Sequence, residues 1–155
     1  DGKNLQKVDW VVGCSILIDL KKFSNKNLFD ENFFLFYEET DFCRKVKLDN
    51  GSTFSSKDLI IDHYGEQGSF ANQEEGKYSY LKLRNWHLMW SSFYYYRKNY
   101  SYNYAFRLLF GTLVKSFFKT IFFAMILKKY NCIKHLYRFL GLINSMIGKK
   151  SWFRV

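Results

Sequence analysis

No acidic side chain occurs after Glu75 in this chain of 155 residues, and this boundary limits the fold more than any other feature. Residues 1–76 carry nine Lys and Arg against fourteen Asp and Glu, whereas residues 77–155 carry fifteen Lys and Arg and no acid. Codon bias can enrich lysine and phenylalanine, but it does not remove every acid from one half. We therefore predict two parts, 1–76 and 77–155, and expect the second to face a negatively charged partner.

The length suits one domain with a core of its own. The chain begins at Asp1 and its first methionine is Met89, so we expect it to be a piece of a longer protein. Its cysteines, Cys14, Cys43 and Cys132, are odd in number and have no Cys-x-x-Cys spacing. They are interpreted as reduced thiols in the cytosol, neither a disulfide framework nor a zinc site.

Three apolar patterns predict the elements of the first part. Residues 8–18 are rich in β-branched side chains and predict a buried strand with a bend at Gly13. Residues 38–51 predict a helix that ends at an Asn-Gly turn. Residues 52–65 predict one or two short strands, the second over 59–63.

The second part predicts three long helices, over 77–99, 103–129 and 131–148. The middle one has no uncharged run near the roughly 18–20 apolar residues that a membrane span requires. Arg107, Lys115 and Lys119 form a stripe among Phe and Leu, which indicates a helix lying in a membrane interface. The alternative is a soluble helix whose apolar face packs on the first part.

The stretch Phe-Phe-Leu-Phe-Tyr-Glu-Glu-Thr-Asp, residues 33–41, sets three carboxylates directly after apolar and aromatic residues. One interpretation is a helix N-terminus, where the macrodipole favours anions. The other is a reaction centre that needs a base. A carboxylate against Phe33, Phe34 and Phe36 would have its pKa raised by desolvation, which makes it a better base near neutral pH.

The order of motifs resembles glycosyltransferase family 2, and most closely its rhamnosyltransferase-like members, which make bacterial surface polysaccharides. The matching segments are Trp-Val-Val-Gly (10–13), Phe-Asp-Glu-Asn-Phe-Phe to Phe-Cys (29–43), Asp-His-Tyr-Gly-Glu-Gln-Gly-Ser (62–69) and Leu-Lys-Leu-Arg-Asn-Trp (81–86). Each motif is weak alone, but the series is fairly specific. The resemblance implies an α/β fold: the acceptor-side, C-terminal half of a GT-A domain over 1–76, followed by an amphipathic helical extension over 77–155.

The resemblance also implies roles for particular residues. Glu39 falls on the second acid of the family's pair, usually Asp, which serves as catalytic base. Asp41 would support it, and His63 would help to bind the metal or the diphosphate. The remaining substrate-binding positions are Trp10 and Gly13, which would line the sugar pocket, Gly65 and Ser69 in a loop over the diphosphate, and Glu38 and Arg84.

Several alternatives stay open beside these roles. Glu38 alone is typical of a solvated acid at a helix start. A lone histidine such as His63 is typical of a structural residue, because one ligand does not make a metal site. His87 and His135 are interpreted as packing or interface residues.

An inverting transferase needs a base to take the proton from an acceptor hydroxyl and positive charge to stabilise the leaving nucleotide diphosphate. The family uses Mg²⁺ or Mn²⁺, and we expect its main Asp-x-Asp ligands upstream of this chain, because no such motif occurs in it. We therefore expect the chain alone to bind nucleotide-sugar poorly and to be inactive.

The expected partners are a nucleotide-sugar donor, a lipid-linked or glycan acceptor, and an anionic membrane surface on the cytoplasmic face. Aromatic rings among lysines and arginines suit such a surface. No nucleic acid is expected, although a basic aromatic nucleic-acid-binding or membrane-binding module without catalysis is the competing hypothesis. A scaffold whose catalytic part has decayed is a third.

Overall fold

The computed structural model describes residues 4–23, 27–63 and 74–155. Its contacts divide the chain into two compact units. Unit 1 comprises Asp1–Glu31 and Tyr37–Gly65, and unit 2 comprises Asn32–Phe36 and Glu66–Val155. Each unit is described by itself.

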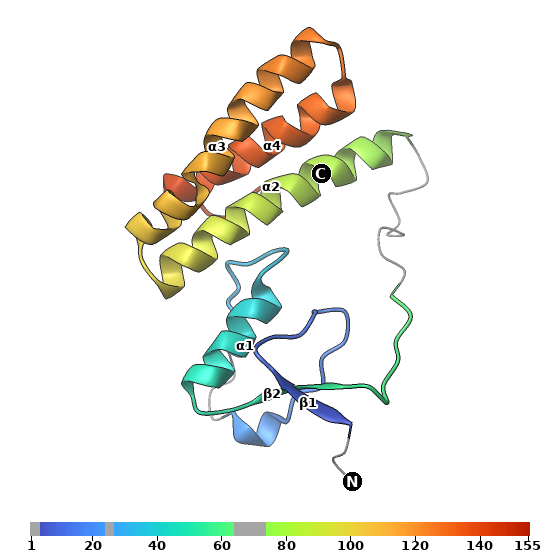
Figure 1. Ribbon diagram of the computed structural model, residues 1–155, viewed down its shortest axis with the longest axis vertical. Coiled ribbons are helices and arrows are strands. Elements are labelled where there is room, and N and C mark those ends of the chain that lie inside the picture. The colour runs from blue at the N-terminus through green and yellow to red at the C-terminus, as the bar shows by residue number, and fades with distance from the viewer. Residues whose placement is uncertain (1–3, 24–26, 64–73) are drawn as a thin grey trace. The chain divides into compact units, whose positions relative to one another are not determined.

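The expected α/β half of a GT-A fold is wrong. The described residues form four α-helices, one short 3-10 helix (Leu20–Lys22) and a single sheet of two antiparallel strands (Figure 1). Strand β1 is Leu5–Val8 and strand β2 is Thr53–Ser56, paired so that Leu5 lies opposite Ser56 and Val8 opposite Thr53. Two strands of four residues cannot build the covered, mostly parallel sheet that an α/β domain requires.

Residues 9–18, in the run expected to be a buried strand, and residues 59–63, expected to be a short strand, are irregular instead. After β1 ends at Val8, residues 9–18 pass through a turn at Gly13 and pair with no strand. Leu17 is 97% exposed, and Ile60, in the run expected to form a strand over 59–63, is 87% exposed. A β-branched run becomes a strand only where a neighbouring strand and a packed face receive it, and unit 1 offers neither at these positions.

Helix α1 (Glu38–Leu48) is the centre of unit 1, and the expected helix over 38–51 is confirmed. Phe42 and Val46, one turn apart, are buried with Cys43, and Val11, Ile18 and the rings of Phe23 and Phe29 pack against this stripe. The Asn-Gly turn ends the helix as expected. Asn50 adopts a left-handed φ of 59°, and the Gly51 N–H donates to the Val46 carbonyl at 2.8 Å.

Unit 2 contains the three expected long helices, which are confirmed as α2 (Glu74–Asn99), α3 (Tyr102–Met125) and α4 (Lys129–Met146). They lie alongside one another, and α4 contacts both of the others (Figure 1). Each helix contributes to one apolar core, formed by Met89, Phe93, Ala105, Leu109 and Leu142. Ser101 starts α3, since its hydroxyl accepts from the Tyr104 N–H at 3.1 Å.

Helices α2 and α4 approach so closely that only glycine fits at position 141. A Cβ there would lie 2.2 Å from the Trp86 carbonyl oxygen. The chain after α4 then returns to α2, where the Trp90 indole donates to the Lys149 carbonyl at 2.9 Å. The His87 ring nitrogen Nε2 lies 2.9 Å from the Phe153 carbonyl. His87 is fully buried, as expected for a packing residue.

Candidate functional site

The chain enters α1 through two residues in the left-handed region. Phe36 has a φ of 67° and Tyr37 a φ of 70°, and no side chain caps the helix at Tyr37. Left-handed angles are uncommon for non-glycine residues and are strained for bulky ones. Such strain is concentrated at functional sites, and here it immediately precedes Glu38 and Glu39.

Glu39 has a carboxyl pKa above its ordinary value. Partial burial raises the pKa of the Glu39 carboxyl, and repulsion from the neighbouring Glu38 adds to the increase. Hydrogen bonds from the backbone N–H groups of Glu39 and Thr40 act in the opposite direction, but the pKa stays above its ordinary value. These two N–H groups are among the donors that a helix start leaves without an internal partner. Their hydrogen bonds hold the Glu39 carboxylate at the N-terminal end of α1.

The structure brings Gly13 against Glu39. A Cβ placed on Gly13 would lie 3.6 Å from both Cβ and Cγ of Glu39 and 3.7 Å from Cδ. The turn at Gly13 therefore runs along the length of the Glu39 side chain. Gly13 and Glu39 belong to two separate motifs, 10–13 and 29–43, which meet at this carboxylate, although residues 9–18 form no strand.

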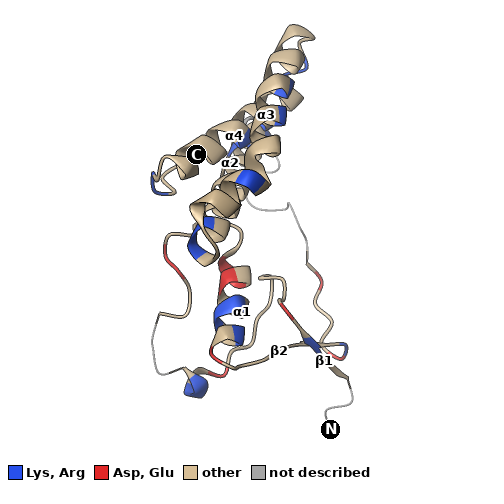
Figure 2. Cartoon of the chain, turned by 60° about the vertical axis from the view of Figure 1, so that its left-hand side comes forward, with Lys and Arg blue, Asp and Glu red and all other residues tan. Residues whose placement is uncertain are grey.

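The other acids of the turn are also withdrawn from solvent. Asp41 is 7% exposed, and its backbone N–H donates to the Tyr37 carbonyl at 2.8 Å. Glu38 has a buried carboxylate oxygen, Oε2, with no hydrogen-bond partner among the described residues. Figure 2 shows the acidic colour at the start of α1. A buried acceptor without a donor is costly.

The remaining residues expected at the site are dispersed. Trp10 and His63 belong to unit 1 and are exposed. Arg84 lies on α2 in unit 2 and is exposed. Gly65 and Ser69 lie outside the described residues. Of the predicted positions, the structure thus brings together Glu38, Glu39 and Asp41 on one helical turn, with Gly13 beside Glu39.

Two of the aromatic residues before α1 pack within unit 2. The Phe33 ring meets Tyr94 edge-on with centroids 5.0 Å apart. The Phe34 ring lies 4.9 Å from the ring of His87, with the Arg154 guanidinium 3.5 Å above it. These rings were expected to form an aromatic wall beside the carboxylate. Within unit 1, the Glu39 side chain lies against the backbone turn at Gly13.

A resident divalent metal does not fit the donor set of the described ranges. They contain no group of three or more His, Cys, Asp or Glu side chains placed to hold a metal ion. His63 is exposed and contributes a single imidazole. One ligand does not make a metal site, so no step of the chemistry below is assigned to a metal held here.

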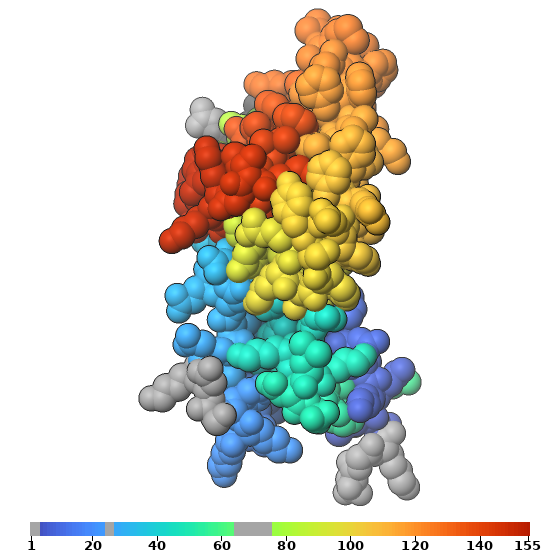
Figure 3. Space-filling model, turned by 90° about the vertical axis from the view of Figure 1, so that its left-hand side faces the viewer, coloured from blue at the N-terminus to red at the C-terminus, as the bar shows by residue number. Residues whose placement is uncertain are grey.

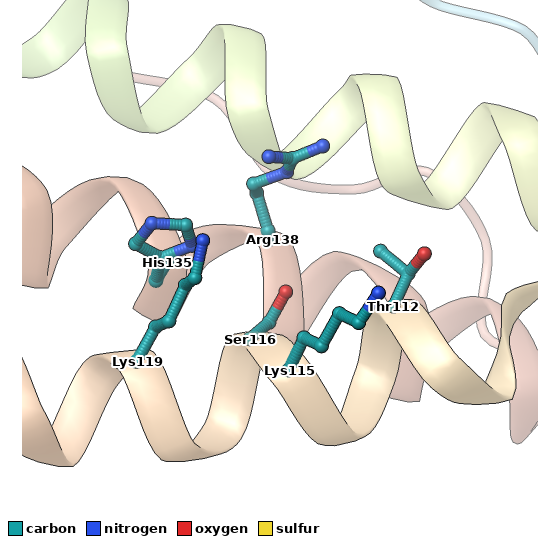
Figure 4. A pocket seen from close by; sticks show the side chains of 6 residues that line it. All are labelled: Thr112, Lys115, Ser116, Lys119, His135 and Arg138. Atoms are coloured by element: carbon teal, nitrogen blue, oxygen red, sulfur yellow. The ribbon is translucent and has the colours of Figure 1, made fainter.

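A second cluster of polar groups lines a pocket between α3 and α4 in unit 2. The pocket has a volume of about 200 Å³. Figure 4 shows Lys115 and Lys119 extending from α3 toward α4, from which His135 and Arg138 project. Its lining residues are Thr112, Lys115, Ser116, Lys119, His135 and Arg138.

Burial and ring stacking hold His135 in place in this pocket. It is 9% exposed, its ring stacks on Phe123 with centroids 5.6 Å apart, and its Nδ1 has no hydrogen-bond partner in the described structure. Burial lowers the pKa of His135, and the positive charges of Lys119, Arg138 and Lys134 lower it further. The imidazole therefore lies in a cationic environment.

Sequence reasoning missed this pocket and interpreted His135 as a packing or interface residue. One signal was present, because Thr112, Ser116 and Lys119 follow at steps of four and three, and His135 and Arg138 are three apart. Such spacing places residues on one face of a helix. The sequence pattern does not show that these two faces meet, because their contact depends on how α3 packs on α4.

Comparisons with known proteins add no relative: no family model, no curated protein and no solved structure matches this chain. The resemblance to glycosyltransferase family 2 therefore rests on the quoted motifs alone.

Proposed function

We propose that this chain provides the catalytic base of an inverting glycosyltransferase, which moves a sugar from a nucleotide-sugar donor to a lipid-linked or glycan acceptor of the bacterial cell surface. The observation that carries the proposal is the Glu39 carboxylate, which is held at a strained helix start, lies against Gly13 and has a raised pKa. A base is most useful when its pKa lies near the working pH.

In this reaction Glu39 accepts the proton of an acceptor hydroxyl while the hydroxyl oxygen attacks the anomeric carbon of the donor sugar. The new carbon–oxygen bond forms as the bond to the nucleotide diphosphate breaks, and the diphosphate leaves with that electron pair. The proton remains on the Glu39 carboxyl. Asp41, two residues further on in the same turn, supports the helix start through its buried position.

The test is sugar transfer by the intact protein, supplied with a panel of nucleotide sugars and a membrane extract as acceptor source. Glu39→Gln should lower the rate by about 10²–10⁴-fold, because an amide cannot accept the proton. Glu39→Asp should keep measurable transfer, since the carboxylate remains but is one methylene shorter. Full activity in the Gln variant would contradict the proposal.

Asp49→Asn provides the matched control for this experiment. Asp49 is an exposed acid at the other end of α1, so its loss removes the same charge without touching the helix start. Its variant should transfer sugar at the unaltered rate.

We further propose that unit 2 rests on an anionic membrane surface. Helix α3 is, by length and composition alone, the one helix among residues 4–23, 27–63 and 74–155 that could cross a membrane, and 11% of its most apolar window is buried. The space-filling view shows its yellow-to-orange surface open to the viewer (Figure 3). Exposed rings together with basic residues and no acids favour an interfacial position.

Salt dependence separates this position from the competing nucleic-acid interpretation. Binding to a nucleic acid should fall steeply as salt rises, because it depends on released counterions. Association with anionic vesicles should fall only in part, because buried rings contribute as well.

A further inference from the structure

We propose that the pocket between α3 and α4 binds the terminal phosphate of a membrane lipid, as a phosphomonoester or diphosphate. The inference rests on the proposed contact of unit 2 with a membrane and adds to it a specific headgroup site. It is independent of Glu39, which belongs to unit 1.

The first argument is uncompensated charge. Lys115, Lys119 and Arg138 line one pocket of about 200 Å³, and residues 77–155 contain no acidic side chain to balance them. Figure 2 likewise shows basic residues and no acidic ones on α3 and α4. Like charges that line one pocket repel one another, and solvent screens this repulsion in part because Lys115 and Lys119 are exposed. A phosphate dianion between them would replace this repulsion with attraction and charge-assisted hydrogen bonds.

The second argument is that two buried nitrogen atoms in the pocket lack hydrogen-bond partners. Nδ1 of His135 and Nε of Arg138 are buried without a hydrogen bond in the described structure, and His135 is 9% exposed. Buried polar atoms are nearly always paired in folded proteins, and those that are not call for an explanation. The hydroxyls of Thr112 and Ser116 add two further donors on the same wall. Together these groups match the several acceptor oxygens of a phosphate.

The third argument concerns the source of the phosphate. The pocket lies on α3 among large apolar side chains that face solvent, namely Phe117 (45% exposed), Phe118 (63%), Ile121 (43%) and Phe122 (52%). A free phosphate would use none of these rings. A lipid would contact both the cationic pocket and the apolar surface, because its headgroup would meet the cations while its chains cover the apolar residues. The observations therefore favour an amphiphile.

The experiment compares binding of the protein to two kinds of phosphatidylcholine vesicle, one containing phosphatidic acid and one containing enough phosphatidylglycerol to give the same surface charge. Phosphatidic acid presents a terminal phosphate, whereas phosphatidylglycerol presents a diester. We expect tighter binding to phosphatidic acid. Lys115→Gln with Lys119→Gln should weaken that binding by roughly 30-fold, the equivalent of about 1 kcal/mol for each lysine, and should remove the preference.

The matched control is Lys149→Gln with Lys150→Gln, which removes two exposed charges outside the pocket. This pair should keep the preference for phosphatidic acid. Arg138→Lys keeps the charge but removes the buried Nε donor, so it should reduce the preference while leaving binding to phosphatidylglycerol unchanged. Circular dichroism of each variant verifies that the helices remain.

Each other outcome overturns the inference. Equal binding to both vesicles, or equal loss of the preference in both lysine pairs, would mean that only overall charge is sensed, while the membrane contact itself would stand. No binding to either vesicle would overturn the membrane contact as well. Displacement by inorganic phosphate at the same phosphate concentration would identify a free anion as the occupant, and displacement by a single-stranded oligonucleotide would identify a nucleic acid.

Discussion

The two units of this chain differ in how much of their structure is held by a packed core. In its described residues, unit 1 has one α-helix with three buried apolar residues, one 3-10 helix, two short strands and long irregular segments. Unit 2 has three long helices that share a core, and a C-terminal segment whose rings pack on Trp86. Because loosely packed regions open more readily than packed cores, we expect unit 1 to open more readily than unit 2. The proposed chemistry lies in the thinly packed acidic unit.

The largest expected effect compares one phenylalanine from each core. Phe93 is fully buried in unit 2, and Phe93→Ala should lower the free energy of unfolding of its helices by about 4 kcal/mol, because it leaves a cavity. Phe42→Ala in unit 1 should act on the amides of α1 and leave those of α2 protected. Hydrogen exchange resolved by residue is the measurement. Equal loss of protection in both units after either substitution would show that the units unfold together.

The next effect tests the contact between α2 and α4. Gly141→Ala would drive a methyl group into the Trp86 carbonyl, so the two helices must separate. We expect a loss of about 3 kcal/mol, at the upper end for overpacking. The control is Gly111→Ala in α3, where nothing lies within 4 Å of the new Cβ. That variant should be more stable by about 0.5–1 kcal/mol, as measured by urea denaturation.

A smaller effect distinguishes the units by pH. Burial lowers the pKa of His87 and of His135, so the unfolded state of unit 2 takes up protons first as pH falls below 6.5. Its free energy of unfolding should therefore fall between neutral pH and about pH 5. Burial raises the pKa of Glu39 above 4.5, so for unit 1 the folded state binds that proton more tightly and acidification over this range adds stability.

Denaturation at several pH values, followed separately in each unit, measures this difference. His87→Gln should flatten the profile of unit 2, since the amide does not titrate. A wild-type profile in which both units lose stability in parallel would contradict the assignment of these groups.

The smallest effect concerns the ion pair of Asp9 with Lys47. The two charged atoms lie 2.7 Å apart, but both side chains are largely exposed. The hydrogen bond and charge of Lys47 lower the pKa of Asp9, yet exposed pairs of this kind contribute little. Asp9→Asn should leave the denaturation midpoint of unit 1 unchanged at neutral pH. A clear drop would show that this pair ties the first strand to α1.

Helices could be predicted from this sequence because their signals are local. The step of four from Phe42 to Val46, the Asn50-Gly51 turn and the long apolar patterns after residue 77 each specify a helix without reference to the rest of the chain. The strands could be predicted only in part: β2 lies within the stretch 52–65, where a short strand was expected, but its partner was placed wrongly. The run at 8–18 has a strand's composition, but a strand needs a partner, and the β2 segment pairs with residues 5–8 instead.

The candidate site likewise could be predicted only where it depends on local sequence. The acids of one helical turn were visible as a cluster in the sequence, and their grouping on α1 follows from the helix. The meeting of Gly13 with Glu39 is a tertiary contact, which the order of the motifs suggested but spacing alone could not specify. The pocket on α3 and α4 was missed because neither helix contains it alone.

The pair of rings in left-handed backbone before α1 has a consequence for how broadly such an enzyme could act. Glycine would adopt these angles freely, whereas Phe36 and Tyr37 leave the entry to the helix little room to adjust. In the proposed reaction, the direction of the Glu39 carboxylate would be set before an acceptor arrives, which would favour a rapid proton transfer in one geometry. Acceptors of another shape would not align with the base, so a rigid entry to α1 would narrow the range of acceptors.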